Sequence, residues 1–221
     1  MKKISQQSKV INALFFCTLV FQDAGTFGIL PLNLFQIIEL IMLITMCIYD
    51  FKIRIKRGII ILFAYIGVLT IINPFDMDSI KTFVFLIMSV TMYHLFLQRV
   101  PLKMSIETIF NAAVLLSIYG CIQELGYILK IPAIYDISNY GLTLNGLDIG
   151  HGSLMRVNSL YAEPAHLGPI LGLGVLIGLI ENRYNKRIQL WKIAIIMVCA
   201  LMTQSFLVYA SVIMGLVCFI L

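Results

Sequence analysis

The chain has 221 residues, of which 60% are hydrophobic and 12% charged, whereas soluble domains have about 45–50% apolar and about 25% charged residues. This composition excludes an ordinary soluble domain and indicates an integral membrane protein. The net charge of +5 does not indicate a nucleic-acid partner, because basic residues in a membrane protein serve first as topology signals.

The apolar residues form successive blocks, and a helix needs about 20 mostly apolar residues to cross a bilayer. No alternating β-barrel pattern is visible, so we expect an all-α fold, a polytopic transmembrane helical bundle with about 7–8 spans. The segment 190–221 is compatible with two short spans or one long tilted helix. The predicted spans are 9–29, 31–49, 58–73, 80–97, 106–129, 164–181 and those within 190–221.

Basic residues between the spans alternate sharply and set the predicted orientation. They cluster before the first span and after the second, fourth and sixth, while the other loops hold only Lys81, Lys130 and Arg156 of the 16 Lys and Arg residues. Because basic loops stay inside, we expect a cytoplasmic N-terminus. The five cysteines lie singly inside apolar runs, which favours neither a disulfide framework nor a zinc site.

A long segment, residues 130–163, separates the fifth and sixth spans on the predicted outer side. It is rich in Gly, Asn, Asp and Ser, and connections above about 12–15 residues are usually functional or disordered. Its aromatic and aliphatic content favours a partly ordered external loop. We treat residues 1–221 as one transmembrane domain that carries this loop.

The stretch "RVNSLYAEPAHLG", residues 156–168, ends the loop and opens the sixth span. Pro164 predicts a helix start, and an acidic residue before it suits the positive end of a helix. Glu163 and His166 then lie on one face of the first turn, and Arg156 reaches the same place if the intervening residues turn. This set suits sugar transfer from a lipid diphosphate, since an arginine and a helix N-terminus stabilise the leaving diphosphate and a carboxylate or imidazole accepts the proton. The alternative is a membrane-edge salt bridge between Arg156 and Glu163 at an ordinary helix start.

Other polar residues lie within the spans, where burial of an ionisable group is costly. Glu124, with Gln123 and Tyr127, is near the outer end of the fifth span and is a further site candidate. Glu39 is mid-span, where we expect a hydrogen-bonded core group, and His94 near the cytoplasmic end is expected to be a satisfied boundary residue. We expect the glycines after the loop to allow close helix packing; these are Gly168, Gly172, Gly174 and Gly178.

The pattern Arg156-x-x-Ser159-x-x-x-Glu163-Pro164-Ala165-His166 resembles the motif that opens a central helix in bacterial polysaccharide polymerases of the Wzy type, which belong with O-antigen ligases in one superfamily. The resemblance extends back to "YGCIQELGYIL" and forward to "LMTQSFLVYASVIMGL", which is similar to a Thr-x-Ser helix of these proteins. Together these cover roughly residues 110–221.

The resemblance implies a metal-independent glycosyltransferase without cofactors in the bacterial inner membrane, with its catalytic face outward. Donor and acceptor are undecaprenyl-diphosphate-linked oligosaccharides, and a chain-length regulator and a flippase of the same pathway are possible partners besides membrane lipid. Arg156 corresponds to the diphosphate contact and Glu163 to the motif carboxylate, with Ser159 and His166 as secondary members. Ser205 matches the serine of the later helix, although Phe206 stands where many relatives carry arginine or threonine.

Family members run to about twice this length and carry a second large external loop, so we expect the chain to be the front part of a larger domain, a truncated form or one piece of a split enzyme. An O-antigen ligase is the nearest enzymatic alternative. A transporter or flippase is the rival from another class, and it predicts inverted repeats, of which the sequence has none. A non-catalytic membrane scaffold is a third reading.

Overall fold

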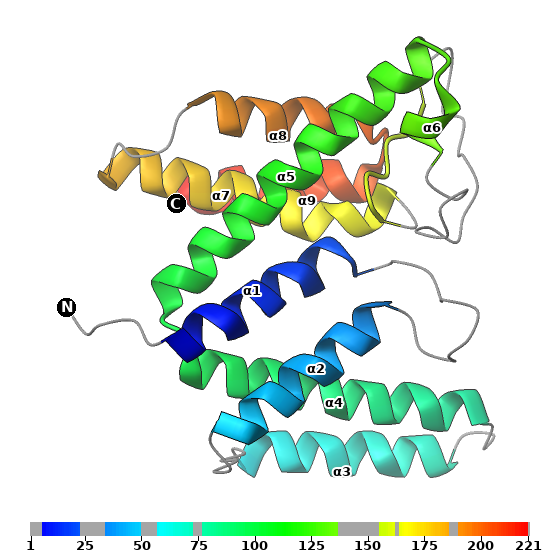
Figure 1. Ribbon diagram of the computed structural model, residues 1–221, viewed down its shortest axis with the longest axis vertical. Coiled ribbons are helices and arrows are strands. Elements are labelled where there is room, and N and C mark those ends of the chain that lie inside the picture. Colours follow the sequence, from blue (N-terminus) through cyan, green and yellow to red (C-terminus); the bar gives the residue numbers. More distant parts are fainter. Residues whose placement is uncertain are drawn as a thin grey trace. The chain divides into compact units, whose positions relative to one another are not determined.

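The computed structural model describes residues 6–22, 34–49, 57–72, 77–136, 155–161, 164–185 and 190–220 (Figure 1). These residues confirm the all-α class, with nine α-helices and a 3-10 helix, η2, in the described ranges. The helices are α1 (Gln6–Val20), α2 (Leu34–Tyr49), α3 (Arg57–Ile72), α4 (Met77–Arg99), α5 (Leu102–Ile128), α6 (Pro132–Tyr135), η2 (Pro164–Leu167), α7 (Gly168–Asn185), α8 (Leu190–Met202) and α9 (Phe206–Ile220).

Among the described residues, three segments are long and apolar enough to cross a membrane: Ile80–Arg99, Leu102–Ile128 and Pro164–Tyr184. Four shorter apolar helices accompany them, at Leu34–Ile48, Arg57–Thr70, Leu190–Met202 and Phe206–Ile220. Many large apolar side chains on these helices are exposed, for example Ile61 at 69% and Leu201 at 66%. Exposed apolar residues in this number suit a lipid environment, and the protein is therefore a membrane protein.

The chain divides into two compact units, which are described separately. The first comprises residues 1–15 and 36–104. Phe15 of α1 packs against Phe96 of α4, with ring centroids 4.2 Å apart, and contacts Tyr93 edge-to-face at 6.0 Å. Methionines from α2 and α4 complete its buried core; they are Met42, Met46 and Met92.

Two polar predictions fall within this first unit. Glu39 is fully buried, and the Ser89 hydroxyl donates a 2.7 Å hydrogen bond to its Oε2, so the expected hydrogen-bonded core group is confirmed. His94 Nε2 lies 2.8 Å from the side-chain nitrogen of Gln98, one turn away on α4, which confirms that His94 has a hydrogen-bond partner.

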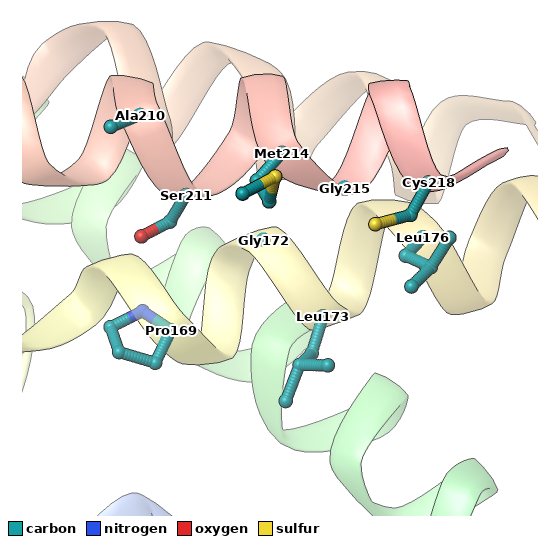
Figure 2. Close-up of a pocket in the computed structure, with 9 residues that line it drawn as sticks. All are labelled: Pro169, Gly172, Leu173, Leu176, Ala210, Ser211, Met214, Gly215 and Cys218. Atoms are coloured by element: carbon teal, nitrogen blue, oxygen red, sulfur yellow. The ribbon is translucent and has the colours of Figure 1, made fainter. Parts of the chain in front are cut away.

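The second unit, residues 16–35 and 105–221, contains α5, α7, α8 and α9. Its glycines bring helices into backbone contact (Figure 2). A Cβ at Gly172 of α7 would lie 2.5 Å from the main-chain oxygen of Ser211 in α9, and a Cβ at Gly174 would lie 2.6 Å from the Ala113 Cβ of α5. Small residues permit this approach, as the glycine spacing predicted.

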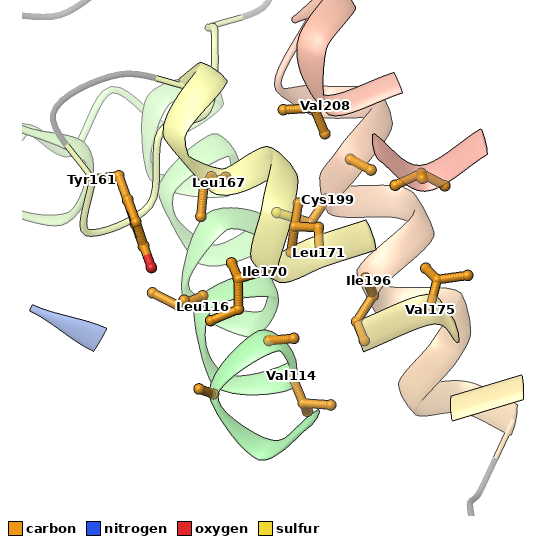
Figure 3. Packing of buried hydrophobic residues seen from close by; sticks show 14 of the residues in the cluster. Val114, Leu116, Tyr161, Leu167, Ile170, Leu171, Val175, Ile196, Cys199 and Val208 are labelled. Atoms are coloured by element: carbon orange, nitrogen blue, oxygen red, sulfur yellow. The ribbon is translucent and has the colours of Figure 1, made fainter. Parts of the chain in front are cut away.

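A buried apolar cluster fills the space between these helices (Figure 3). Leu116 of α5, Leu171 of α7 and Ile196 of α8 are all fully buried within it. Tyr161 is 1% exposed, and its hydroxyl donates a 2.6 Å hydrogen bond to the Leu19 carbonyl of α1. This rigid cluster carries the segment 155–161, which leads into the predicted site.

The end of the chain resolves the alternative left open by its sequence. Residues 190–220 form two short helices, α8 and α9, rather than one long helix. Thr203, Gln204 and Ser205 separate them, and Gln204 has a left-handed φ of 48°. The turn places Ser205 directly before the first residue of α9.

Candidate functional site

Gln123 of α5 holds the segment 155–161 in place. Its Nε2 donates to Asn158 Oδ1 at 2.9 Å and to the Tyr135 carbonyl at 3.0 Å, while its Oε1 accepts a 2.9 Å hydrogen bond from the main-chain N–H of Ser159. One amide side chain thereby joins α5, α6 and the segment that contains Arg156. Gln123 is 1% exposed, so this network is shielded from solvent.

Ser159 lies at the centre of the turn after Arg156. It has a left-handed φ of 54°, and the Tyr161 N–H donates to the Asn158 carbonyl at 3.0 Å, which closes the turn. The Ser159 hydroxyl donates to the Leu116 carbonyl at 2.8 Å, and the residue is fully buried. Ser159 therefore positions the segment, and its hydroxyl is engaged inside the protein.

The turn between α8 and α9 lies against the same segment. The Val157 N–H donates to the Met202 carbonyl of α8 at 3.3 Å. A helix leaves its last four carbonyl groups without helical partners, and here all four accept hydrogen bonds; the donors are Thr203, Gln204, Tyr209 and Val157. The carbonyl groups at the C-terminal end of α8 are thus all hydrogen-bonded within the protein, and one of them binds Val157, the residue that follows Arg156.

Two helix N-termini also meet here. η2 begins at Pro164 and is followed by α7 from Gly168, α9 begins at Phe206, and α7 and α9 run parallel and side by side (Figure 2). A Cβ at Gly168 would lie 3.0 Å from the Ser211 hydroxyl and 3.3 Å from the Leu207 carbonyl, so the first turns of both helices are in contact. Their N–H groups point in one direction, and each helix start carries a partial positive charge.

The structure describes two of the three predicted catalytic residues, Arg156 and His166. Arg156 is half-buried, between the buried Met155 and Val157, and His166 is exposed on η2. Glu163 lies outside the described residues. The structure confirms the helix start at Pro164 and the turn between Arg156 and Tyr161.

Of the predicted binding residues, Gln123 and Ser159 are in direct contact. Glu124 is 3% exposed, and its carboxylate faces the main-chain N–H of Met155, the residue before Arg156. The Tyr127 ring packs edge-to-face on Tyr135, 5.4 Å between centroids. Ser205 is 5% exposed, and its N–H lies 3.4 Å from the Thr203 hydroxyl oxygen.

Sequence reasoning missed the residues that assemble this region. Asn158 and the α6 carbonyl of Tyr135 complete the Gln123 network, and Tyr119 donates to the Ile134 carbonyl at 3.1 Å. Asn158 stands beside Ser159 in the motif stretch and could have been singled out as a turn residue. No sequence signal pointed to the carbonyl acceptors, because every residue carries one.

Within the described ranges, no group of three His, Cys, Asp or Glu side chains is arranged to hold a metal ion. Around this segment the described residues offer a guanidinium group at Arg156, an imidazole at His166 and two helix N-termini beside a buried amide network. Comparison with known protein families, with curated proteins and with solved structures found no match to this chain.

Proposed function

We propose that this protein is a glycosyltransferase of the bacterial inner membrane that joins undecaprenyl-diphosphate-linked oligosaccharides into a surface polysaccharide. The proposal follows the resemblance of residues 156–166 to the motif of Wzy-type polymerases. In this arrangement the N-terminus is cytoplasmic, the spans number seven to eight, and the segment before Pro164 faces outward with the catalytic residues.

The observation that carries the proposal is the meeting of two helix N-termini beside the segment that contains Arg156. The starts of α7 and α9 are in contact, and Val157 bonds to the end of α8, which directly precedes α9. Helix N-termini and arginine together favour phosphate oxygens, because both offer N–H donors and positive charge. Since the carbonyl groups at the end of α8 accept internal hydrogen bonds, they repel a bound diphosphate less.

The reaction breaks the bond between the anomeric carbon and the diphosphate oxygen, and the diphosphate leaves with the electron pair. An acceptor hydroxyl attacks the anomeric carbon, and its proton passes to Glu163 or His166. Arg156 and the helix N-termini stabilise the charge that develops on the leaving diphosphate. Gln123 and Ser159 hold the Arg156 segment in position and do not touch the reacting atoms.

Replacing Arg156 by alanine, and separately Glu163 by glutamine, tests the proposal in the source strain. We expect loss of long-chain polymer and accumulation of single repeat units on a gel, because the diphosphate loses its cation or the acceptor loses its base. Arg183→Ala is the matched control: Arg183 is exposed at the other end of α7, 5.5 Å from the Phe219 ring, and its loss should leave polymer length unchanged. Unchanged polymer in both Arg156→Ala and Glu163→Gln, with normal protein levels, would contradict the proposal.

A further inference from the structure

A small polar pocket lies between α5, α7 and α8, at the end of the second unit away from the Arg156 segment. It encloses about 220 Å³, which is less than the about 300–1,000 Å³ of typical small-molecule sites. The pocket therefore suits one compact chemical group rather than a whole large ligand. Its polar lining residues are Glu107, Asn111, Glu181 and Lys192.

The helices bring these residues together at one end of the second unit. Glu107 and Asn111 are four residues apart on α5 and therefore share one face of that helix. The end of α7, which carries Glu181, and the start of α8, which carries Lys192, lie on the same side as the start of α5 (Figure 1). Phe110 of the buried cluster also lines the pocket, so the pocket ends at the apolar core.

The pocket has charges of both signs. Two carboxylates and the amide oxygen of Asn111 can accept hydrogen bonds, and the ammonium group of Lys192 can donate them. No hydrogen bond or ion pair joins Glu107 or Asn111 to another described residue. Lys192 Nζ lies 5.8 Å from the centroid of the Trp191 ring, and this cation–π contact leaves its N–H donors for an anionic partner. The lining thus matches a ligand that has an ammonium group close to an anionic group.

The residues around the pocket are those of a membrane–water interface. Trp191 is 51% exposed and Tyr184 is 75% exposed, and these two residue types favour the level of the lipid headgroups. Lys103 in the first turn of α5 and Arg183 in the last turn of α7 are exposed as well. A lipid headgroup is therefore the ligand that meets this pocket at the highest local concentration.

We propose that the pocket binds the headgroup of an aminophospholipid, with its ammonium group at Glu107 and Glu181 and its phosphate at Lys192. The ammonium group has three N–H donors for the carboxylates and the Asn111 amide, and the phosphate accepts from Lys192. A purely anionic headgroup would face two like charges, and a divalent cation would face the Lys192 ammonium. A choline headgroup has no N–H donor to offer.

This site is separate from the proposed glycosyltransferase site. Glu107 and Gln123 lie on the same helix, about 24 Å apart along its axis. The lipid proposal therefore does not depend on the proposed function, and its test involves neither Arg156 nor the polymer.

Trp191 is the single tryptophan of the chain and reports on the pocket through its contact with Lys192. Dihexanoyl phosphatidylethanolamine is titrated into the full chain in detergent, and the tryptophan emission and the unfolding temperature are measured. We expect a saturable change in emission, because the phosphate draws Lys192 from the ring, and a higher unfolding temperature. Phosphatidylcholine and phosphatidylglycerol with the same chains should bind several-fold more weakly.

Substitutions identify the groups that bind the lipid. Glu107→Gln should weaken binding several-fold and leave the unfolding temperature of the lipid-free protein unchanged, because Glu107 is exposed. Lys192→Gln should abolish the lipid-induced rise in unfolding temperature, which is the readout for this variant because it alters the Trp191 signal. Lys103→Gln is the matched control, since Lys103 is an exposed lysine at the same end of α5 that does not line the pocket. It should bind the lipid as the wild type does.

Three results would overturn the proposal. They are equal affinity for phosphatidylcholine or phosphatidylglycerol, wild-type affinity in Glu107→Gln, and an equal response to MgCl₂ without lipid. O-phosphoethanolamine tests whether the ligand comes from the membrane. It should bind several-fold more weakly, because it has no acyl chains in the micelle, and equal affinity would indicate a site for a soluble zwitterion and contradict the lipid assignment.

Discussion

Replacing Gln123 by leucine removes the side chain that joins α5 to α6 and to the Arg156 segment. The change deletes hydrogen bonds to Asn158, to the Tyr135 carbonyl and from the Ser159 N–H. Leucine has a similar volume, so the main loss is in polar contacts rather than in packing. The Ser159 N–H is then left buried without its acceptor.

The expected loss of stability follows from these contacts. Side-chain hydrogen bonds between membrane helices contribute about 0.6 kcal/mol each on average, and a stranded buried N–H costs about 1–3 kcal/mol. The two bonds donated by Gln123 and the stranded N–H together give a decrease of about 2–4 kcal/mol in the free energy of unfolding. Because the lost bonds hold the Arg156 segment, polymer length should also fall although Arg156 itself is intact.

Thermal unfolding in detergent measures the first effect, and alkylation of a cysteine introduced at the half-buried Leu160 measures exposure of the segment. Gln98→Leu is the matched control, because Gln98 is exposed and contacts His94 within α4. Its effect should stay within about 0.5 kcal/mol. If Gln123→Leu unfolds at the wild-type temperature and the segment is no more reactive, the Gln123 contacts do not position it.

Three further substitutions test the packing. Gly172→Leu should prevent accumulation of folded protein, since even a Cβ would lie 2.5 Å from the main-chain oxygen of Ser211. Gly58→Ala is the control and should be tolerated, because a Cβ at Gly58 would have nothing within 4 Å. Immunoblots of the membrane fraction compare the amounts of the two variants. Ser89→Ala should lower stability by about 1–3 kcal/mol because Glu39 loses its donor, and an unchanged melting temperature would show that this bond contributes nothing. Tyr161→Phe should lower the free energy of unfolding by about 1 kcal/mol in the same assay, because the hydrogen bond to the Leu19 carbonyl of α1 is lost. An unchanged melting temperature would mean that water replaces the tyrosine hydroxyl.

The sequence by itself determined the membrane class and most of the helices. Apolar blocks of spanning length predicted helices because unsatisfied backbone groups are not tolerated in lipid. Pro164 marked a helix start because proline lacks the N–H that a first turn does not need. The glycines of α7 predicted close packing, since only small side chains let two backbones approach. Each of these inferences depends on local composition or spacing.

Only the tertiary structure decided which polar residues meet. Gln123 and Ser159 are far apart in the sequence, and their contact depends on the left-handed turn at Ser159 and on the packing of Gly120 of α5 against Val157. The break at Gln204 was left open by the sequence, because Thr203, Gln204 and Ser205 interrupt a run that is otherwise apolar enough to continue as one helix. It forms where Val157 and the side chains near the turn satisfy the carbonyl groups at the end of α8. These hydrogen bonds involve backbone groups that every sequence contains. The packing of the folded chain therefore decides which of these groups pair.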